Sequence, residues 1–546
     1  MASASEADAP DWAALPFSAV ALIVAHASCL PRHQSGAALS ALRLANRHWR
    51  SAVDDSIRSW HLQPYIGAPH NRVAAVLRRW QHLEALTLSS CVVDEAALQA
   101  LGRCRRLSQL SFTHFVRFDL PGAAAARRLW EVVAALPALQ LLTVHASDEG
   151  PTPAGLAALA GCSSLTALEL HDFHREDIAI DVVAVLRGAT RIQHLALHRS
   201  VRATAVQAQQ AFDIGFATQL TSLELRASFT HDDDFLGLFA TLTSLRRLDI
   251  SANRNLTDDG FLGITRLAAC LTALVMEGGH SVTENGATAL AASSGLQMLS
   301  LAFSNRMSSD ALLPLVAGTL TQLTSLNIQG CARACSPAAF GALSTLTSLR
   351  QLVARDCRLQ QSAVAALAHL TNLQMLCLSD NTALSLLDQL TCLRGCMDLD
   401  VSDCELEDHH LVRLLASLPQ LRNVNISSNP HLTAAGLEAL AAGPARTTLQ
   451  SLEATSLRLD WETVLKLLPQ FKALESINLS GNEGLVDPTA LLLAAEAAPS
   501  LHTIWVVRVN LQTADGLDSL AHSRHDPGRR RLLLMQPWDS QIAAFA

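Results

Sequence analysis

Lysine and tyrosine are almost absent from this chain of 546 residues. Lys466 and Lys472 are its two lysines, against 39 arginines, and Tyr65 is its one tyrosine. Aromatic residues make up 4% of the chain and charged residues 16%, while 49% are hydrophobic. We therefore expect an extensive core built from Leu, Ala and Val. Because alanine is also abundant, the excess of arginine over lysine is what a GC-rich genome would produce.

Long apolar runs are missing as well. No stretch of about 18 uncharged apolar residues is present, which predicts that the chain does not cross a membrane. The apolar segment 19–30 follows Glu6, Asp8 and Asp11, and no Lys or Arg precedes Arg32. This is the wrong flank for a secretory signal, which begins with basic residues. We expect a cytosolic or nuclear protein.

Motifs for catalysis, cofactors and metals are also lacking. The chain has no Gly-rich phosphate loop ending in Gly-Lys, no His-Glu-x-x-His and no Gly-x-Ser-x-Gly. Its 12 cysteines form no secreted disulfide framework, and the C-x3-C pairs at Cys331 and Cys392 lack a second pair at zinc-binding spacing. The net charge of −8 is mild and argues against nucleic acid as the main partner. These absences predict a non-enzymatic protein without a cofactor or bound metal.

What the sequence does contain is a repeat of about 26 residues. The pattern Leu-x-x-Leu-x-Leu-x-x-(Asn/Cys/Ser)-x-x-Leu occurs seventeen times between residues 83 and 511. One interval is 32 residues long, and the others measure 23 to 28. The leading apolar residues are Leu83, Leu107, Leu139, Leu165, Ile192, Leu220, Leu245, Leu271, Leu296, Leu323, Leu349, Leu373, Cys396, Leu421, Leu449, Leu474 and Leu501.

Each repeat predicts one short strand and one helix. Within Leu-x-Leu, alternate side chains point to opposite faces, so the leucines face inward and the x positions form an exposed face. The Asn or Cys that follows, such as Asn253 or Cys404, can satisfy backbone groups as the chain turns. Thr and acidic residues then begin an Ala- and Leu-rich helix. One repeat cannot bury its own apolar face, so the repeats must stack.

The repeat resembles the leucine-rich repeat family, in its cysteine-containing and ribonuclease-inhibitor-like types, over roughly four-fifths of the chain. The resemblance implies an α/β fold, a horseshoe-shaped solenoid with a parallel concave sheet and outer helices. We expect this solenoid over residues 66–520 and a C-terminal cap or tail over residues 521–546. The long interval from Leu107 to Leu139 predicts either a loop over the concave face or a lengthened helix.

A different pattern precedes the repeats. Residues 1–10 are expected to be disordered and residues 11–65 to form a small all-α region. Leu15-Pro16 and Ile23, in an apolar helix, are followed by Leu42, Leu44 and Asn46-Arg47-x-Trp49-Arg50. This order resembles the F-box family, in which Leu-Pro opens the motif and a later helix carries Arg-x-Trp-Arg. The chain departs from that family at Phe17, because the usual Glu after Leu-Pro is missing, and at Ala45, where Cys or Ser is commoner.

Together, the two resemblances imply the substrate receptor of an SCF-type cullin-RING ubiquitin ligase. Leu15, Pro16, Ile23, Leu42 and Leu44 would bind a Skp-type adaptor, which joins the chain to the cullin core, and the concave face would hold a substrate protein. Outside that complex we expect a monomer. Two lysines would leave few acceptors for self-ubiquitination. The alternative is a leucine-rich repeat scaffold or GTPase regulator whose N-terminal helices only cap the solenoid.

Two polar zones stand out among the exposed strand positions. His145, His171 and His198 share one column in successive repeats, so their imidazoles are expected to form a ladder across adjacent strands. Both zones suit either partner binding or an ordinary solvated face. The first zone also includes Glu169, His194, Glu224 and Arg226, and the second, acidic zone includes Asp356, Asp380, Asp398, Asp400 and Asp403.

Apolar side chains are also expected on this face. We expect Met298, Phe303 and Met375 to add an apolar element between the two zones. Trp505 is exposed by its strand register, which favours an interface, although cover by the C-terminal tail would explain it equally well.

Overall fold

The computed structural model describes most of the repeat region. The predicted adaptor-binding residues Leu15, Pro16, Ile23, Leu42 and Leu44 lie outside the described residues. The residues described are 57–62, 72–113, 116–119, 125–146, 155–173, 178–200, 218–227, 242–253, 257–267, 269–278, 283–304, 307, 312–317, 319–384, 387–485, 490, 493–494, 498, 500–501, 503–506 and 533–535.

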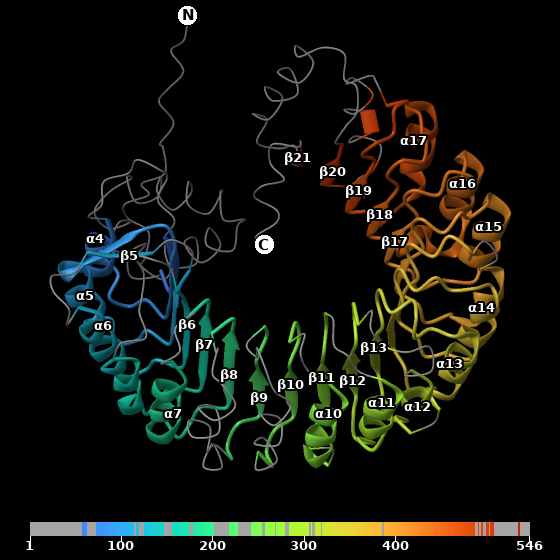
Figure 1. Cartoon of the computed structure of the whole chain (residues 1–546). Helices are drawn as coiled ribbons and strands as arrows, with labels where there is room; N and C mark the ends of the chain where they lie inside the picture. The colour runs from blue at the N-terminus through green and yellow to red at the C-terminus, as the bar shows by residue number, and fades with distance from the viewer. Residues whose placement is uncertain are drawn as a thin grey trace, which may run out of the picture. The chain divides into compact units, whose positions relative to one another are not determined.

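The chain divides into two compact units. Unit 1 comprises residues 1–230 and 241–245, and unit 2 comprises residues 231–240 and 246–546. In each unit a parallel sheet carries its described helices on one side (Figure 1). We call the other side of each sheet its open face.

Unit 1 contains a sheet of seven described parallel strands in chain order. The strands are β1 (Ser59–Leu62), β2 (Ala85–Leu88), β4 (Gln109–Phe112), β6 (Leu141–His145), β7 (Ala167–His171), β8 (His194–His198) and β9 (Ser222–Glu224). The helical elements are α4 (Arg72–Arg79), α5 (Glu95–Leu101), α6 (Ala125–Ala134), the 3-10 helix η2 (Leu156–Gly161) and α7 (Ile178–Gly188).

Unit 2 repeats the same arrangement over twelve described strands, again parallel and in chain order. These are β10 (Arg247–Asp249), β11 (Ala273–Val275), β12 (Met298–Ser300), β13 (Ser325–Asn327), β14 (Gln351–Val353), β15 (Met375–Cys377), β16 (Asp398–Asp400), β17 (Asn423–Asn425), β18 (Ser451–Glu453), β19 (Ser476–Asn478), β20 (Thr503–Trp505) and β21 (Leu533–Met535). The helices are α10 (Asp258–Ile264), α11 (Glu284–Ala291), α12 (Leu312–Val316), α13 (Pro337–Ala342), α14 (Ser362–Leu367), α15 (Asp408–Ala416), α16 (Ala434–Ala442) and α17 (Trp461–Leu467). Short 3-10 helices follow or replace some of them: η5 (Thr265–Leu267), η6 (Leu343–Thr345), η7 (Asp388–Cys392), η8 (Pro444–Thr447) and η9 (Leu468–Gln470).

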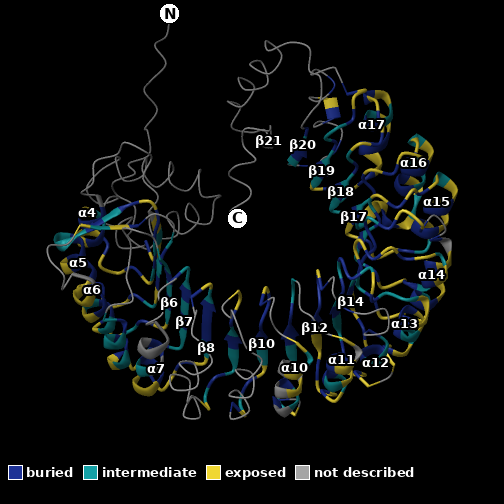
Figure 2. Cartoon of the chain, in the orientation of Figure 1, coloured by how far each residue is buried: buried dark blue, intermediate teal, exposed yellow. Residues whose placement is uncertain are grey.

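Alternation along the strands buries the repeat leucines as predicted. In β7, Leu168 and Leu170 have no exposed surface, whereas Ala167, Glu169 and His171 on the open face are half-buried. Buried residues run along the strands, and exposed residues concentrate on the outer surfaces of the helices (Figure 2). The predicted leucine-rich repeat fold is confirmed for the described residues.

The Asn and Cys positions form the expected polar ladder inside the turns. Buried Asn429 donates from Nδ2 to the carbonyls of Val401 and Ile426, at 3.0 and 2.8 Å. Its Oδ1 accepts from the backbone N–H groups of Cys404 and Leu406, at 3.1 and 3.0 Å. A cysteine supplies only the donor half of this role, as Cys404 Sγ does toward the Leu378 carbonyl at 3.2 Å.

Left-handed backbone conformation recurs just before the ladder position. Gly330 has φ +70°, and Phe303, Asp356, Asp380 and Asp403 have φ between 49° and 60°. Aspartate tolerates this region better than most residues, but a bulky aromatic such as Phe303 does so only under constraint.

Helix starts are capped by the predicted threonines. Thr433 Oγ1 accepts the N–H of Ala435 at 3.2 Å, and Thr283 caps α11 in the same way. Neighbouring helices are also joined by ion pairs, such as Lys466 Nζ on α17 with Glu438 Oε1 on α16, at 2.5 Å. None of the described helices has the length and apolarity needed to cross a membrane.

The long interval after Leu107 is divided between a strand and a helix. β5 (Arg117–Asp119) pairs in parallel with β3 (Val92–Asp94) as a separate two-stranded sheet, and α6 follows. The lengthened-helix expectation thus missed β5. The sheet extends beyond the predicted solenoid range of 66–520 at both ends. β1 lies within residues 11–65, which were predicted to be all-α, and pairs with β2. β21 lies within the predicted cap or tail, residues 521–546, and pairs with β20.

Candidate functional site

A row of stacked histidines lies on the open face of unit 1. The strand register aligns His145 with His171 and His171 with His198, as the sequence predicted. The rings of His145 and His171 stack with centroids 4.2 Å apart and planes 4° apart. His198 meets His171 edge-on, with centroids 4.5 Å apart. The three imidazoles therefore form one continuous polar strip across β6, β7 and β8.

Glu169 is the central carboxylate of this strip. Its Oε1 lies 3.5 Å from His194 Nε2, and its Oε2 accepts from Thr143 Oγ1 at 3.0 Å and lies 3.9 Å from His171 Nε2. The nearby imidazoles of His171 and His194 hold the pKa of Glu169 well below its usual range, and the hydrogen bond from Thr143 adds to their effect against the opposing effect of burial. Glu169 is therefore an anion throughout the physiological pH range.

A second carboxylate closes the strip at β9. Glu224 Oε2 lies 3.4 Å from His198 Nε2, and Arg226 follows two residues later. The side chains of Glu169, His171, His194, His198 and Glu224 are 17% to 29% exposed, and His145 is half-buried, so these residues are held by neighbours and still accessible. We call His145, Glu169, His171, His194, His198 and Glu224 the histidine zone. It presents donors, acceptors and fixed negative charge to a partner at one place.

The acidic zone of unit 2 is brought together differently. Asp398 and Asp400 lie on β16, but Asp380 lies in the turn after β15 and forms an ion pair with Arg355. Asp400 Oδ1 accepts from the N–H and the hydroxyl of Ser402, at 3.0 and 2.7 Å. Asp398 accepts from Asn423 Nδ2.

Local backbone needs explain part of this acidic cluster. Asp356, Asp380 and Asp403 all occupy the left-handed position before the ladder residue, so the prediction that they lie on strands was wrong. Burial raises the pKa of Asp403, and the charge and hydrogen bond of Asp380 raise it further. The carboxylates of Asp380 and Asp403 therefore lie close together, and their negative charges repel each other.

Polar residues that the sequence analysis passed over extend the zone. The strand register continues from Asp400 to Asn425, Glu453, Asn478 and Trp505. Asn478 Nδ2 donates to Glu453 Oε2 at 2.6 Å, while burial raises the pKa of Glu453. Applying the same register count to every repeat would have found this column.

Two of the exposed apolar side chains of unit 2 lie at or beside β12. Met298 is 36% exposed and Phe303 is 49% exposed. Gly330 leaves room for the Phe303 ring, because a Cβ there would lie 2.9 Å from Phe303 Cδ1. Trp505, predicted to be exposed, is half-buried in β20, whose register pairs it with Met535 of β21.

Parallel strands and inward leucines occur in both units, and an Asn/Cys ladder lines the turns of unit 2. The described chain has a leucine-rich repeat fold. No family model matches the chain. The human tubulin-specific chaperone cofactor E-like protein is 37% identical over 87 residues, which are 16% of this chain and 20% of that protein. The match thus spans about a fifth of that relative's length.

Similarity to solved structures is distant. An internalin of Listeria monocytogenes is 18% identical, with a TM-score of 0.40, over 67% of this chain and 93% of that one. TLR13 in its complex with ssRNA13 is also 18% identical, with a TM-score of 0.43, over 84% of this chain and 65% of that one.

Proposed function

We propose that this chain is a non-catalytic scaffold that binds a partner protein on the open faces of its sheets. The histidine zone is the observation that carries the proposal. Its side chains are partly buried and fixed by one another, so their polar groups are ordered before a partner arrives. Exposed Met298 and Phe303 supply the kind of apolar surface that interfaces use.

We further propose that the bound partner is a ubiquitination substrate. In this proposal, residues 11–65 dock on a Skp-type adaptor through Leu15, Pro16, Ile23, Leu42 and Leu44, and the adaptor joins the chain to a cullin-RING ligase. The support is the order of the F-box-like residues in the sequence. The chain would act by proximity, raising the effective concentration of a substrate lysine beside the charged ubiquitin-conjugating enzyme.

The adaptor proposal is tested by co-purification of the full chain with a Skp-type adaptor and cullin. We expect wild type to recover both, and a variant with Leu15→Ala, Pro16→Ala and Ile23→Asp to recover neither. A matched variant with His171→Ala and Glu224→Ala should recover both, because its changes lie on the open face. If folded wild type recovers no adaptor, the N-terminal residues serve as a cap and the scaffold or GTPase-regulator alternative replaces the ligase receptor.

The open-face proposal needs its own test. Proteins cross-linked to wild type in cells should be lost from the variant with His171→Ala and Glu224→Ala. They should be retained by Leu262→Ser, which changes a 57% exposed side chain on α10 of the helix side. Equal capture by all three chains would contradict binding at the histidine zone. Far-UV circular dichroism establishes beforehand that each variant is folded.

A further inference from the structure

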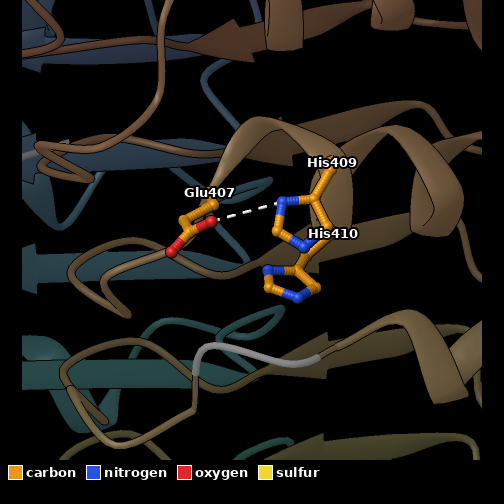
Figure 3. Close-up of side chains that lie close together, drawn as sticks. All are labelled: Glu407, His409 and His410. Carbon is orange, nitrogen blue, oxygen red and sulfur yellow. Dashed lines mark ion pairs between the residues drawn. The ribbon is translucent and has the colours of Figure 1, made fainter.

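Three metal-ligating side chains meet at the start of helix α15. Glu407 occupies the N-cap position, but its carboxylate makes no capping hydrogen bond. Instead, its Oε2 lies 3.2 Å from Nδ1 of His409. The next residue, His410, places its ring beside that of His409, with centroids 3.6 Å apart and planes 42° apart (Figure 3).

The geometry of this cluster is close to that of a coordination shell. Each of the three residues offers one ligand atom, and the three atoms lie within 4.8 Å of one another. Two ligands at Zn–N and Zn–O distances of about 2.0–2.2 Å in tetrahedral geometry stand roughly 3.5 Å apart. Small side-chain rotations would therefore bring the three ligand atoms to coordination distance from one ion. Within the part of the chain that the structure describes, no other group of three His, Cys, Asp or Glu residues meets the same condition.

Burial divides the three ligands into a fixed one and two adjustable ones. His410 is 7% exposed and packed in the repeat, whereas the side chains of His409 and Glu407 are 58% and 56% exposed. An ion could thus reach the cluster from solvent. Two imidazoles and one carboxylate are a donor set suited to Zn²⁺, Ni²⁺ or Cu²⁺ and poorly suited to Ca²⁺ or Mg²⁺.

The local backbone is held in place by the next repeat. Asp408 accepts hydrogen bonds from Thr433 N–H and Oγ1–H, at 2.8 and 2.5 Å, and from Gly436 N–H at 3.1 Å. These bonds tie the first turn of α15 to the first turn of α16. A cation at a helix N-terminus is opposed by the helix dipole, but the charges of Glu407 and Asp408 offset that effect.

We infer that Glu407, His409 and His410 form a binding site for one divalent transition-metal ion of the zinc class. Water completes the coordination shell. The sequence predicted no metal, because its cysteine pairs lack zinc-binding spacing and it contains no His-Glu-x-x-His motif, while the adjacent histidines His409 and His410 match neither pattern. The site lies at a helix start rather than on the strands, so it does not depend on whether an open face binds a partner.

The test uses the full chain, stripped with a chelator and kept reduced, in calorimetric titration with Zn²⁺. Wild type should bind one more equivalent than His409→Ala and than Glu407→Gln, both changes at exposed positions. His369→Ala, at another exposed histidine of unit 2, should match wild type. Zn²⁺ should also raise the unfolding temperature of wild type and His369→Ala more than that of His409→Ala, since the ion stabilises only the folded first turn.

Equal stoichiometry in wild type and His409→Ala would overturn the site. So would an equal loss in His369→Ala, which would mean diffuse binding to surface histidines. As a second readout, Co²⁺ bound to wild type should show ligand-field absorption that His409→Ala lacks. A spectrum identical in the two chains would also contradict the inference.

Discussion

At the scale of single residues, asparagine and cysteine fill the ladder position with unequal effect. Asn429 satisfies two backbone carbonyls and two backbone N–H groups of adjacent turns, whereas Cys404 only donates. We expect Asn429→Ala to lower the free energy of unfolding by roughly 2–4 kcal/mol, because it leaves buried polar groups unsatisfied. Cys404→Ala should cost less than half as much. Urea unfolding followed by far-UV circular dichroism measures both, and equal losses would contradict this account.

The depressed pKa of Glu169 predicts a pH-dependent contribution to stability. A carboxyl whose folded pKa is lowered stabilises the fold above its unfolded value of 4.5, and that contribution is lost as the pH falls toward the folded value. Glu169→Gln should therefore lower the free energy of unfolding by on the order of 1–3 kcal/mol near neutral pH. The difference from wild type should shrink progressively below about pH 4.5.

Denaturant unfolding of wild type and Glu169→Gln at about pH 6 and about pH 3 checks this sign. Glu475→Gln, an exposed glutamate of unit 2, is a control outside the histidine zone. A wild-type advantage that is larger in acid than near neutrality would show that the His171 and His194 contacts do not stabilise the carboxylate.

At the scale of elements, the turn after β13 couples two successive repeats. A Cβ at Gly330 would lie 2.9 Å from the Phe303 ring and would need a left-handed conformation at φ +70°. We expect Gly330→Ala to destabilise the fold by about 1–2 kcal/mol. In a Phe303→Ala background the steric part should vanish, leaving only the backbone cost. A double-mutant cycle measures the difference, and strict additivity would rule out the contact.

A residue's position in these elements could be predicted where a sequence pattern determines the backbone around it. The Leu-x-Leu alternation determines strand direction and register, so the column of His145, His171 and His198 could be predicted. The positions of Asp356, Asp380 and Asp403 could not, because the turn selects them for a left-handed backbone. The adjacency of Glu407 to His409 depends on side-chain rotation at a helix start, which no repeat period encodes.

At the scale of the whole molecule, burial protects the thiols. The eleven cysteines that the structure describes are all free, and eight of them are buried. Burial raises the pKa of Cys91 and Cys104 to about 11 and that of Cys331 and Cys404 to about 12. Buried thiols of this kind are inert because the thiolate is the reactive form.

We therefore expect a disulfide reagent at about pH 8 to modify native protein mainly at the half-buried Cys270 and Cys392 among the described thiols. Cys335 is also half-buried, but its hydrogen bond with Cys357 and its burial raise the pKa of its thiol strongly, so we expect it to react slowly. The buried thiols should react only together with loss of the circular dichroism signal. Guanidinium-denatured protein, in which all 12 cysteines react, gives the reference count. Rapid modification of the buried set in folded protein would show that the stack opens locally.

The ion pair between α16 and α17 determines which lysine of the chain reacts first with an amine reagent. Only two side chains, Lys466 and Lys472, carry primary amines. The hydrogen bond to Glu438 raises the pKa of Lys466, which slows its reaction with acylating reagents, while Lys472 is exposed. An amine-reactive fluorophore would thus attach to the side chains of the folded protein chiefly at Lys472, without engineered cysteines. Without Glu438 the pKa of Lys466 would fall, and the fluorophore would also attach to Lys466. Labelling at Lys466 would therefore report whether the contact between α16 and α17 is formed.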